Sequence, residues 1–157
     1  MNIQIGELGY MKTLETDRLI LRDWTLDDIG CDVYDEGTIR FLVSALNNYA
    51  VVLKESGEVI GTIGINEDAA NDPDARNVGV SILEQYRNKG LMSEAMTCVI
   101  QNIGDITKKL SWLCWVEDKR SQHLAEKLGF RLVNTFYNVK PSGFEQPEDF
   151  YYYILEL

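Results

Sequence analysis

The chain has 157 residues, of which 45% are hydrophobic and 25% are charged, as is typical of a single globular domain. Its 25 acidic and 15 basic residues give a formal net charge of −10, which disfavours binding to the phosphate backbone of nucleic acids. The same charge favours cationic partners such as amines, or else serves solubility alone.

Three further classes are excluded by the absence of their signals. The three cysteines show no C-x-x-C spacing, so neither a disulfide framework nor a metal site is predicted. No segment is long and apolar enough to span a membrane, and the first residues lack a signal-peptide pattern. We therefore expect a cytoplasmic protein without metal, membrane or nucleic-acid partners.

The first part of the chain predicts a strand, two helical segments and a β-hairpin. Residues 18–24, RLILRDW, surround a short apolar run with charged positions, which is typical of a strand. The following Thr-Leu-Asp-Asp has the form of a capping box and predicts a helix over 25–36, with a second short helical piece over 38–46. Two β-rich runs joined by a Gly-containing turn then predict an antiparallel pair, residues 49–54 and 59–66.

The middle of the chain predicts a strand, a helix and a second strand. A polar loop precedes the apolar run 77–83, which is expected to be a strand. Apolar residues beyond it recur with helical spacing from Leu91 to Ile103, so one face of this helix should pack on the sheet. Residues 111–116, SWLCWV, are almost continuously apolar, which indicates a buried strand parallel to 77–83.

The last part predicts one more helix and two strands. Asp118 is a natural N-cap and Gly129 a natural stop for a helix over 118–129. Residues 130–139 and 150–155 are expected to be strands, because the segment between them is too polar and too rich in Pro and Gly to be an element itself.

A donor-rich turn between strand 77–83 and the following helix is the first candidate site. Free N–H groups at a helix N-terminus favour an anion, most often a phosphate. Gly90 would let the backbone approach such a ligand, and Arg87 and Lys89 would add positive charge. The known ATP and NAD loop motifs are absent, and a solvated basic turn without a ligand remains the alternative.

Three fragments of the sequence resemble the GNAT acetyltransferases. The run from Arg87 to Met92, RNKGLM, is similar to the acetyl-CoA signature of that family, which is Arg or Gln, two residues, Gly, one residue, then Gly or Ala. Residues 121–130, SQHLAEKLGF, resemble the family's later helix, and LETDRLILRDWTLDD resembles the start of the branch that contains RimJ and RimL, the ribosomal-protein N-terminal acetyltransferases. Met92 departs from the last motif position, where this branch often has a bulky residue.

The resemblance implies the fold and its extent. We expect an α/β (α+β) protein with a mixed central sheet of about six to seven strands flanked by about four helices. The GNAT-like acetyltransferase domain would be a single domain over residues 11–157, preceded by an N-terminal extension over residues 1–10.

The resemblance also implies an activity. Members of the family move an acetyl group from acetyl-CoA to a primary amine by direct attack, and the acceptor here would be a small amine or a protein N-terminus. The pantetheine arm would lie beside the strand ending at Ile82 and Leu83. The diphosphate would lie on the turn and on the start of the helix, namely Arg87, Asn88, Lys89, Gly90, Leu91, Met92 and Ser93.

Candidate catalytic residues follow from the resemblance as well. The position where many members have a proton-donating Tyr is Ala125, whereas this branch uses a Ser, here Ser121, three residues after the position of Asp118. Ser121 would protonate the leaving thiolate, unless it is only a first-turn residue, and Asp118 would lie near CoA or act purely as an N-cap. Glu67, beside Asp68 at the end of strand 59–66, is the candidate base acting through water, with an exposed surface acid as the alternative.

Two rival functions and two open points remain at this stage. A non-catalytic CoA-binding module with the same fold would explain the departures at Ala125 and Asp118. In the second rival, a protein-interaction module, the basic turn would be only a surface feature. The acceptor loops, expected over residues 47–49 and 140–149, carry no recognised motif. The oligomeric state is not fixed by the sequence, and a homodimer is compatible with it.

Overall fold

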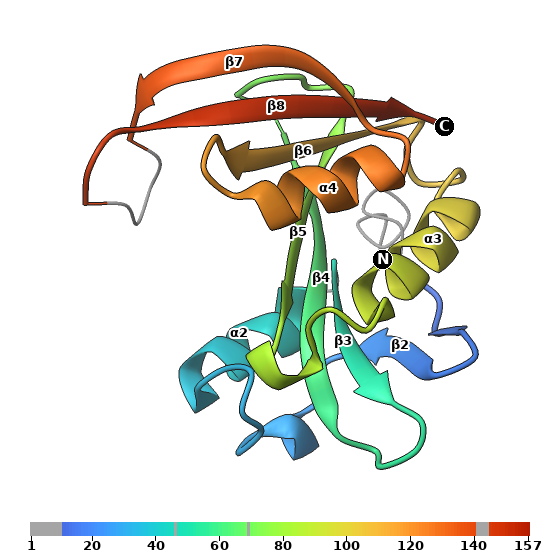
Figure 1. The fold of residues 1–157 in the computed structure, drawn as a ribbon. Helices are drawn as coiled ribbons and strands as arrows, with labels where there is room; N and C mark the ends of the chain where they lie inside the picture. The colour runs from blue at the N-terminus through green and yellow to red at the C-terminus, as the bar shows by residue number, and fades with distance from the viewer. Residues whose placement is uncertain (1–10, 46, 69, 141–144) are drawn as a thin grey trace. The chain divides into compact units, whose positions relative to one another are not determined.

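A computed structural model of the chain describes residues 11–45, 47–68, 70–140 and 145–157. The expected extension over residues 1–10 lies outside the described residues. The chain divides into two compact units (Figure 1), one made by the residues up to Asn66 together with Gly79–Ile106, and the other by Glu67–Val78 and Thr107–Leu157.

The first unit is built on antiparallel strands and confirms the predicted hairpin. Its strands are adjacent in the order β1 to β5, with antiparallel pairing of β1 with β2, β2 with β3 and β3 with β4. Gly57 adopts φ 76 in the turn between β3 and β4, a left-handed conformation that glycine accepts without strain. The bounds are β1 Leu14–Glu15, β2 Leu19–Asp23, β3 Asn48–Leu53, β4 Val59–Glu67 and β5 Arg76–Ile82.

The predicted helix over 25–36 is wrong. Only a 3-10 turn forms, at Leu26–Asp28, because Asp28 is drawn back to accept from the Arg22 guanidinium at 2.8 and 2.9 Å and from the Thr25 amide at 2.9 Å. Gly30 follows at φ 101, a conformation that a helix cannot contain. The α-helix of this region is α2, Glu36–Ala45, where a short helical piece was predicted.

Two helices of the first unit contribute apolar faces. Residues of α2 join a buried cluster made of Trp24, Ile39, Leu42, Ala50, Val52 and Val59. The helix α3, Leu91–Asn102, buries the face that the spacing predicted, with Leu91, Met92, Ala95, Met96 and Val99 inside. This packing fixes where the N-terminus of α3 lies within the unit.

The second unit combines parallel and antiparallel pairing. The first residues of β5 pair in parallel with β6, Lys109–Trp115, as predicted, and β8, Glu148–Glu156, pairs antiparallel with both β6 and β7, Arg131–Val139. The helix α4, Lys119–Lys127, contacts β6, and β7 and β8 form a long hairpin (Figure 1). Gly129 follows α4 at φ 97, as predicted for its stop.

The predicted counts need correction. The described residues form eight strands and three α-helices with two 3-10 turns, rather than about six to seven strands and about four helices. The two-residue strand β1 is too short to show an alternating pattern, and the expected first helix is reduced to a turn. No helix among the described residues has both the length and the hydropathy needed to cross a membrane.

Candidate active site

The turn that leaves β5 is a compact chain reversal in the first unit. A 3-10 turn, Glu84–Tyr86, follows the strand, with the Arg87 amide donating to the Glu84 carbonyl at 3.1 Å. Asn88 and Gly90 both adopt left-handed backbone, at φ 62 and φ 76, which Asn and Gly tolerate best. Arg87, before Asn88, has extended backbone, at φ −73 and ψ 160.

The helix α3 begins at this turn without a side-chain cap. Gly90 is its N-cap and makes no side-chain hydrogen bond to the first turn, so the amides of Leu91, Met92 and Ser93 have no intrahelical acceptor. The side chains of Leu91 and Met92 are buried, and Met92 therefore serves the core at the position where it departs from the family motif. The helix dipole adds partial positive charge at this end.

The two cations of the turn, Arg87 and Lys89, have different surroundings. The Nε atom of Arg87 is buried and has no hydrogen-bond partner in the described part of the chain, a state that costs free energy unless an acceptor arrives. The Lys89 ammonium lies 5.9 Å from the centroid of the Tyr86 ring, and the Tyr86 hydroxyl donates to Glu58 Oε1 at 2.5 Å. The turn thus offers uncapped amides, an orphaned guanidinium N–H and a lysine in one region.

A third cation near the turn was missed by the sequence interpretation. Arg18, just before β2, donates from Nε to Glu94 Oε1 at 2.8 Å and from Nη1 to the Lys89 carbonyl at 3.1 Å. Glu94 also accepts from the Thr16 hydroxyl at 2.5 Å and from the Arg18 amide at 2.9 Å. These partners lie 71 to 78 residues apart in the sequence, so no local pattern could have indicated them.

These hydrogen bonds also affect the acid–base state of Glu94. Burial by itself would raise the pKa of this carboxyl, but the hydrogen bonds from Thr16 and Arg18 outweigh burial and hold the pKa below its usual value. Glu94 therefore stays ionised in the first turn of α3 and fixes the Arg18 guanidinium in place.

Ile82 and Leu83, the predicted pantetheine contacts, are half-buried at the end of β5. The Leu83 amide donates to the Ile60 carbonyl at 2.8 Å, so the neighbouring strand already uses this donor. At Gly61 an added Cβ would lie 2.4 Å from the Ser81 carbonyl oxygen, which requires a glycine on β4 at this point. The contact of Ile82 and Leu83 with pantetheine stays a prediction.

The second unit holds Ser121 and Asp118 at the start of α4. The Asp118 carboxylate caps the helix by accepting from the Ser121 amide at 3.0 Å, as the N-cap alternative predicted. The buried Trp112 indole donates to Ser121 Oγ at 2.9 Å. Because the indole N–H occupies one lone pair of this oxygen, the hydroxyl proton is directed to another acceptor.

Two titratable side chains of the second unit near Ser121, Cys114 and Tyr153, have raised pKa values. Burial raises the pKa of the Cys114 thiol, with a hydrogen bond from Ser121 acting in the opposite direction. Burial, with the nearby Cys114 and Glu126, raises the pKa of Tyr153 to about 12, so this phenol is neutral near pH 7. Ala125 is fully buried, and no hydroxyl is present where many family members have a Tyr.

The two acids at the end of β4 have different environments. Glu67, the predicted base, has a side chain that is 72% exposed, and its Oε1 lies 3.6 Å from Arg76 Nη1. Asp68 is only 7% exposed and accepts from the Ser111 hydroxyl at 2.6 Å and from the Tyr152 hydroxyl. Asp68 ties a loop to β6 and β8, whereas Glu67 remains accessible to solvent.

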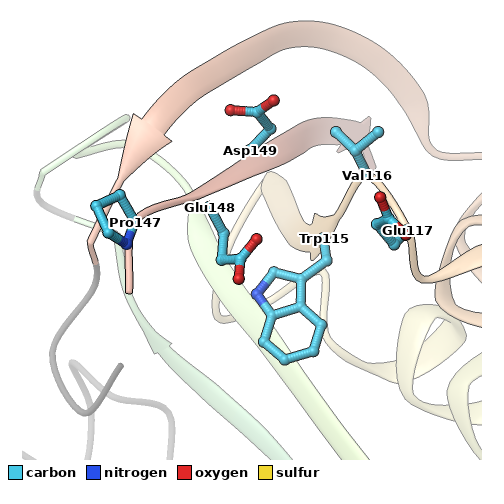
Figure 2. Close-up of a pocket in the computed structure, with 6 residues that line it drawn as sticks. All are labelled: Trp115, Val116, Glu117, Pro147, Glu148 and Asp149. Atoms are coloured by element: carbon cyan, nitrogen blue, oxygen red, sulfur yellow. The ribbon is translucent and has the colours of Figure 1, made fainter. Parts of the chain in front are cut away.

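The second unit has an acidic recess that was not predicted from the sequence. It encloses about 430 Å³ and is lined by Trp115, Val116, Glu117, Pro147, Glu148 and Asp149. Figure 2 shows one group of these residues at the end of β6 and the other at the start of β8. The Trp115 side chain is 44% exposed, and Asp149 Oδ1 accepts from the Asn138 amide at 2.9 Å.

The recess contains part of one expected acceptor loop. Residues 147–149 belong to the predicted loop 140–149, of which residues 141–144 lie outside the described part. Its wall carries three carboxylates and an indole without a basic residue, an arrangement that attracts cations. Among the described residues no cluster of three or more His, Cys, Asp or Glu side chains could hold a metal ion.

Comparison with known proteins decides the family. A family model described as an acetyltransferase (GNAT) domain matches residues 32–131. The chain belongs to the GNAT acetyltransferase family. The resemblance stated from the sequence is thereby confirmed, whereas no curated protein sequence matches this one significantly.

Solved structures of this family share the fold. A GNAT acetyltransferase from Bacillus anthracis superimposes with a TM-score of 0.76 at 21% identity, covering 92% of this chain and 98% of the other. A Salmonella typhimurium acetyltransferase, described as modifying the N-terminal serine of ribosomal protein L7/L12, gives 0.75 at 13% identity and 93% and 99% coverage. The microcin C7 self-immunity acetyltransferase MccE, solved with acetyl-CoA and AMP, gives 0.67 at 19% identity and 90% and 93% coverage. The predicted GNAT-like fold is confirmed.

Proposed function

We propose that this GNAT acetyltransferase moves an acetyl group from acetyl-CoA to a primary amine. The observation that carries the proposal is the start of α3, where Gly90 leaves the first-turn amides uncapped and the buried Arg87 Nε has no partner among the described residues. A diphosphate would provide acceptors for both, and its charge would be favoured by the helix dipole.

The residues of the turn fit the coenzyme's anionic part. The amides of Leu91, Met92 and Ser93 would hold the diphosphate, with Arg87 and Lys89 supplying charge and Asn88 and Gly90 the left-handed backbone. Ile82 and Leu83 would line the pantetheine arm. When bound, acetyl-CoA supplies the activated acetyl group and a thiol leaving group.

Ser121 is our proposed proton donor to the departing thiolate. The Trp112 indole donates to the Ser121 oxygen, which orients the hydroxyl, and the hydroxyl proton would turn from the Cys114 thiol to the departing thiolate. Asp118 would support this role by fixing the first turn of α4 through the Ser121 amide. Glu67, accessible to solvent at the end of β4, would accept a proton from the incoming ammonium through water.

The acceptor is proposed to be cationic before it reacts. The net charge of −10 and the acidic recess around Trp115 both favour an ammonium group. A small amine and a protein N-terminus both meet this requirement. Named acceptors of the related structures include the N-terminal serine of a ribosomal protein, which supports testing N-terminal peptides.

The first test is thermal unfolding with and without excess acetyl-CoA. A ligand that binds only the folded state raises the midpoint of unfolding. At a hundredfold excess over Kd it adds about 2.7 kcal/mol to the free energy of unfolding. Binding should be followed by thiol release with a panel of amines and N-terminal peptides. Binding without turnover of any acceptor would favour the non-catalytic CoA-binding module, and an unchanged midpoint would favour the interaction module.

The contribution of the recess is tested separately with Glu148→Gln and Trp115→Ala. Removing a charge or the indole should raise KM for the acceptor by roughly two- to fivefold, since cation–π contacts at exposed sites contribute about 0.5–1 kcal/mol. Glu55→Gln, an exposed charge change on the β3–β4 turn, is the matched control. Equal KM values for all variants would remove the recess from the acceptor path.

A further inference from the structure

We infer that Arg18 is a further coenzyme-binding residue, which donates to the diphosphate from the Nη2 group of its guanidinium. The inference deepens the proposed function and rests on it. Arg18 lies in the fragment LETDRLILRDWTLDD, but that fragment does not indicate its relation to the turn, which exists only after β2 and α3 have come together within the first unit.

Two of the three nitrogen atoms of the Arg18 guanidinium, Nε and Nη1, donate hydrogen bonds within the first unit. Nε donates to Glu94 Oε1 at 2.8 Å and Nη1 donates to the Lys89 carbonyl at 3.1 Å. Nη2 has no hydrogen-bond partner among the residues that the structure describes. This group lies 3.7 Å from the point that a Cβ on Gly90 would occupy, so its donors lie beside the glycine that begins α3.

The position of Arg18 is set before any ligand binds. Glu94 is held by the Thr16 hydroxyl at 2.5 Å and by the Arg18 amide at 2.9 Å, and the Thr16 hydroxyl also accepts from the Leu19 amide at 3.0 Å. A long side chain normally loses rotamer freedom when it contacts a ligand. Here the fold has already fixed the side chain, so the loss on binding is small.

Glu94 also limits how much Arg18 contributes. Its carboxylate compensates the guanidinium charge on the Nε side, so the contact with a phosphate depends on the direction of the Nη2 donors more than on net charge. The side chain is 48% exposed, and water screens what charge remains. A moderate, ligand-specific effect is therefore expected.

A second ion pair in the same unit shows what a purely structural pair looks like. Arg40 donates from Nε to Glu36 Oε2 at 2.8 Å, the same distance and the same pair of groups, Nε and a carboxylate, as in the Arg18–Glu94 pair. Among the described residues Arg40 donates to no backbone carbonyl, and it lies on α2, far along the sequence from the turn before α3. Arg40→Gln is therefore the matched control for Arg18→Gln.

The experiment measures the dissociation constants of CoA, 3′-dephospho-CoA and pantetheine for the wild type, R18Q, R18K and R40Q. For R18Q we expect roughly tenfold weaker binding of both CoA and dephospho-CoA, the effect of losing one charge-assisted hydrogen bond. Binding of pantetheine, which has no phosphate, should be unchanged. R18K should lose affinity for the same two ligands, because an ammonium cannot bind Glu94, a carbonyl and a phosphate in a fixed fork.

The outcomes separate this inference from the function on which it rests. A wild type that binds none of the ligands would overturn the proposed coenzyme and Arg18 with it. A wild type that binds CoA with R18Q of equal affinity would overturn Arg18 alone. Equal weakening of all three ligands would mean that Arg18 only shapes the unit, and weakening of CoA alone would assign Arg18 to the 3′-phosphate instead. If R18Q does not fold, the affinities of R18K for CoA, 3′-dephospho-CoA and pantetheine decide between these results.

Discussion

The N-termini of α3 and α4 solve the same problem in different ways. Each helix leaves its first amides without intrahelical acceptors, and α4 satisfies one of them with its own Asp118 carboxylate. The helix α3 begins at Gly90, which has no side chain to offer, and Arg18, held by Glu94, lies beside it. The described residues supply no capping anion at α3, and we therefore propose a ligand at one helix and a catalytic support at the other.

The same comparison shows that hydrogen bonding indicates a candidate anion site better than the number of basic residues does. Both helix starts have basic residues within a few positions, namely Arg87 and Lys89 at α3 and Lys119 and Arg120 at α4. At α3 they are accompanied by a helix start without a side-chain cap and by the unpartnered Arg87 Nε, whereas α4 has the Asp118 carboxylate as its cap. A count of basic residues would not distinguish the two sites.

The largest expected effect comes from Gly90→Val, which should abolish CoA binding. A β-branched residue at φ 76 is strained by about 1–3 kcal/mol, and its side chain would cover the uncapped amides. Loss of two charge-assisted hydrogen bonds corresponds to a hundredfold or greater rise in Kd, on the order of 3 kcal/mol. Calorimetric titration with CoA is the measurement.

Gly57→Val controls for the strain in that experiment. Gly57 adopts the same φ of 76 in the β3–β4 turn, with no atom within 4 Å of an added Cβ. It should lower the unfolding midpoint as Gly90→Val does and leave the Kd of CoA unchanged. Retained CoA affinity in a folded Gly90→Val variant would remove the turn from the site.

Ser121→Ala should have the next largest effect, on turnover rather than on binding. A general acid contributes on the order of 100-fold or more to rate, so kcat should fall by roughly that factor while the Kd of CoA stays the same. Trp112→Phe keeps the hydroxyl and removes the indole donor, which separates the proton donor from its orienting hydrogen bond. An undiminished kcat in Ser121→Ala would leave Ser121 as a first-turn residue only.

Asp118→Ala should destabilise the protein by about 1 kcal/mol, the usual contribution of a helix N-cap. For a chain of this length the midpoint of unfolding would fall by about 2–4 °C. Asp118→Asn can still accept from the Ser121 amide and should restore most of the loss. If Asp118→Asn instead changes CoA affinity strongly, the carboxylate acts on the ligand and the contrast between the two helices fails.

The smallest expected effect is a fall in stability at acidic pH. Burial opposes ionisation of Asp28 and Glu94, but their hydrogen bonds with Arg22 and Arg18 respectively hold both pKa values below the usual range. The unfolded chain therefore binds more protons, so stability is present above about pH 4.5 and is lost as pH falls through the folded-state values. Chemical denaturation between pH 3 and pH 7 measures this, and Glu94→Gln should reduce the decline.

Much of the fold could be predicted because its signals are local. The apolar spacing from Leu91 onward predicted the buried face of α3, and Gly57 predicted the hairpin between β3 and β4. The helix over 25–36 failed because the Arg22–Asp28 ion pair and the left-handed Gly30 override a capping-box pattern. A capping box indicates where a turn begins, and tertiary contacts decide whether the turn becomes a helix.

The sequence by itself determined the resemblance to the family, the strand-turn-helix unit and the left-handed Gly90 that begins α3, because a glycine motif and apolar periodicity act over a few neighbouring positions. The tertiary structure decided which polar groups have partners. Arg18 reaches Lys89 and Glu94 across 71 and 76 residues, Trp112 orients Ser121, and Asp68 rather than Glu67 is buried among hydroxyls. Such pairings depend on which elements pack together, and the order of residues along the chain carries no local record of them.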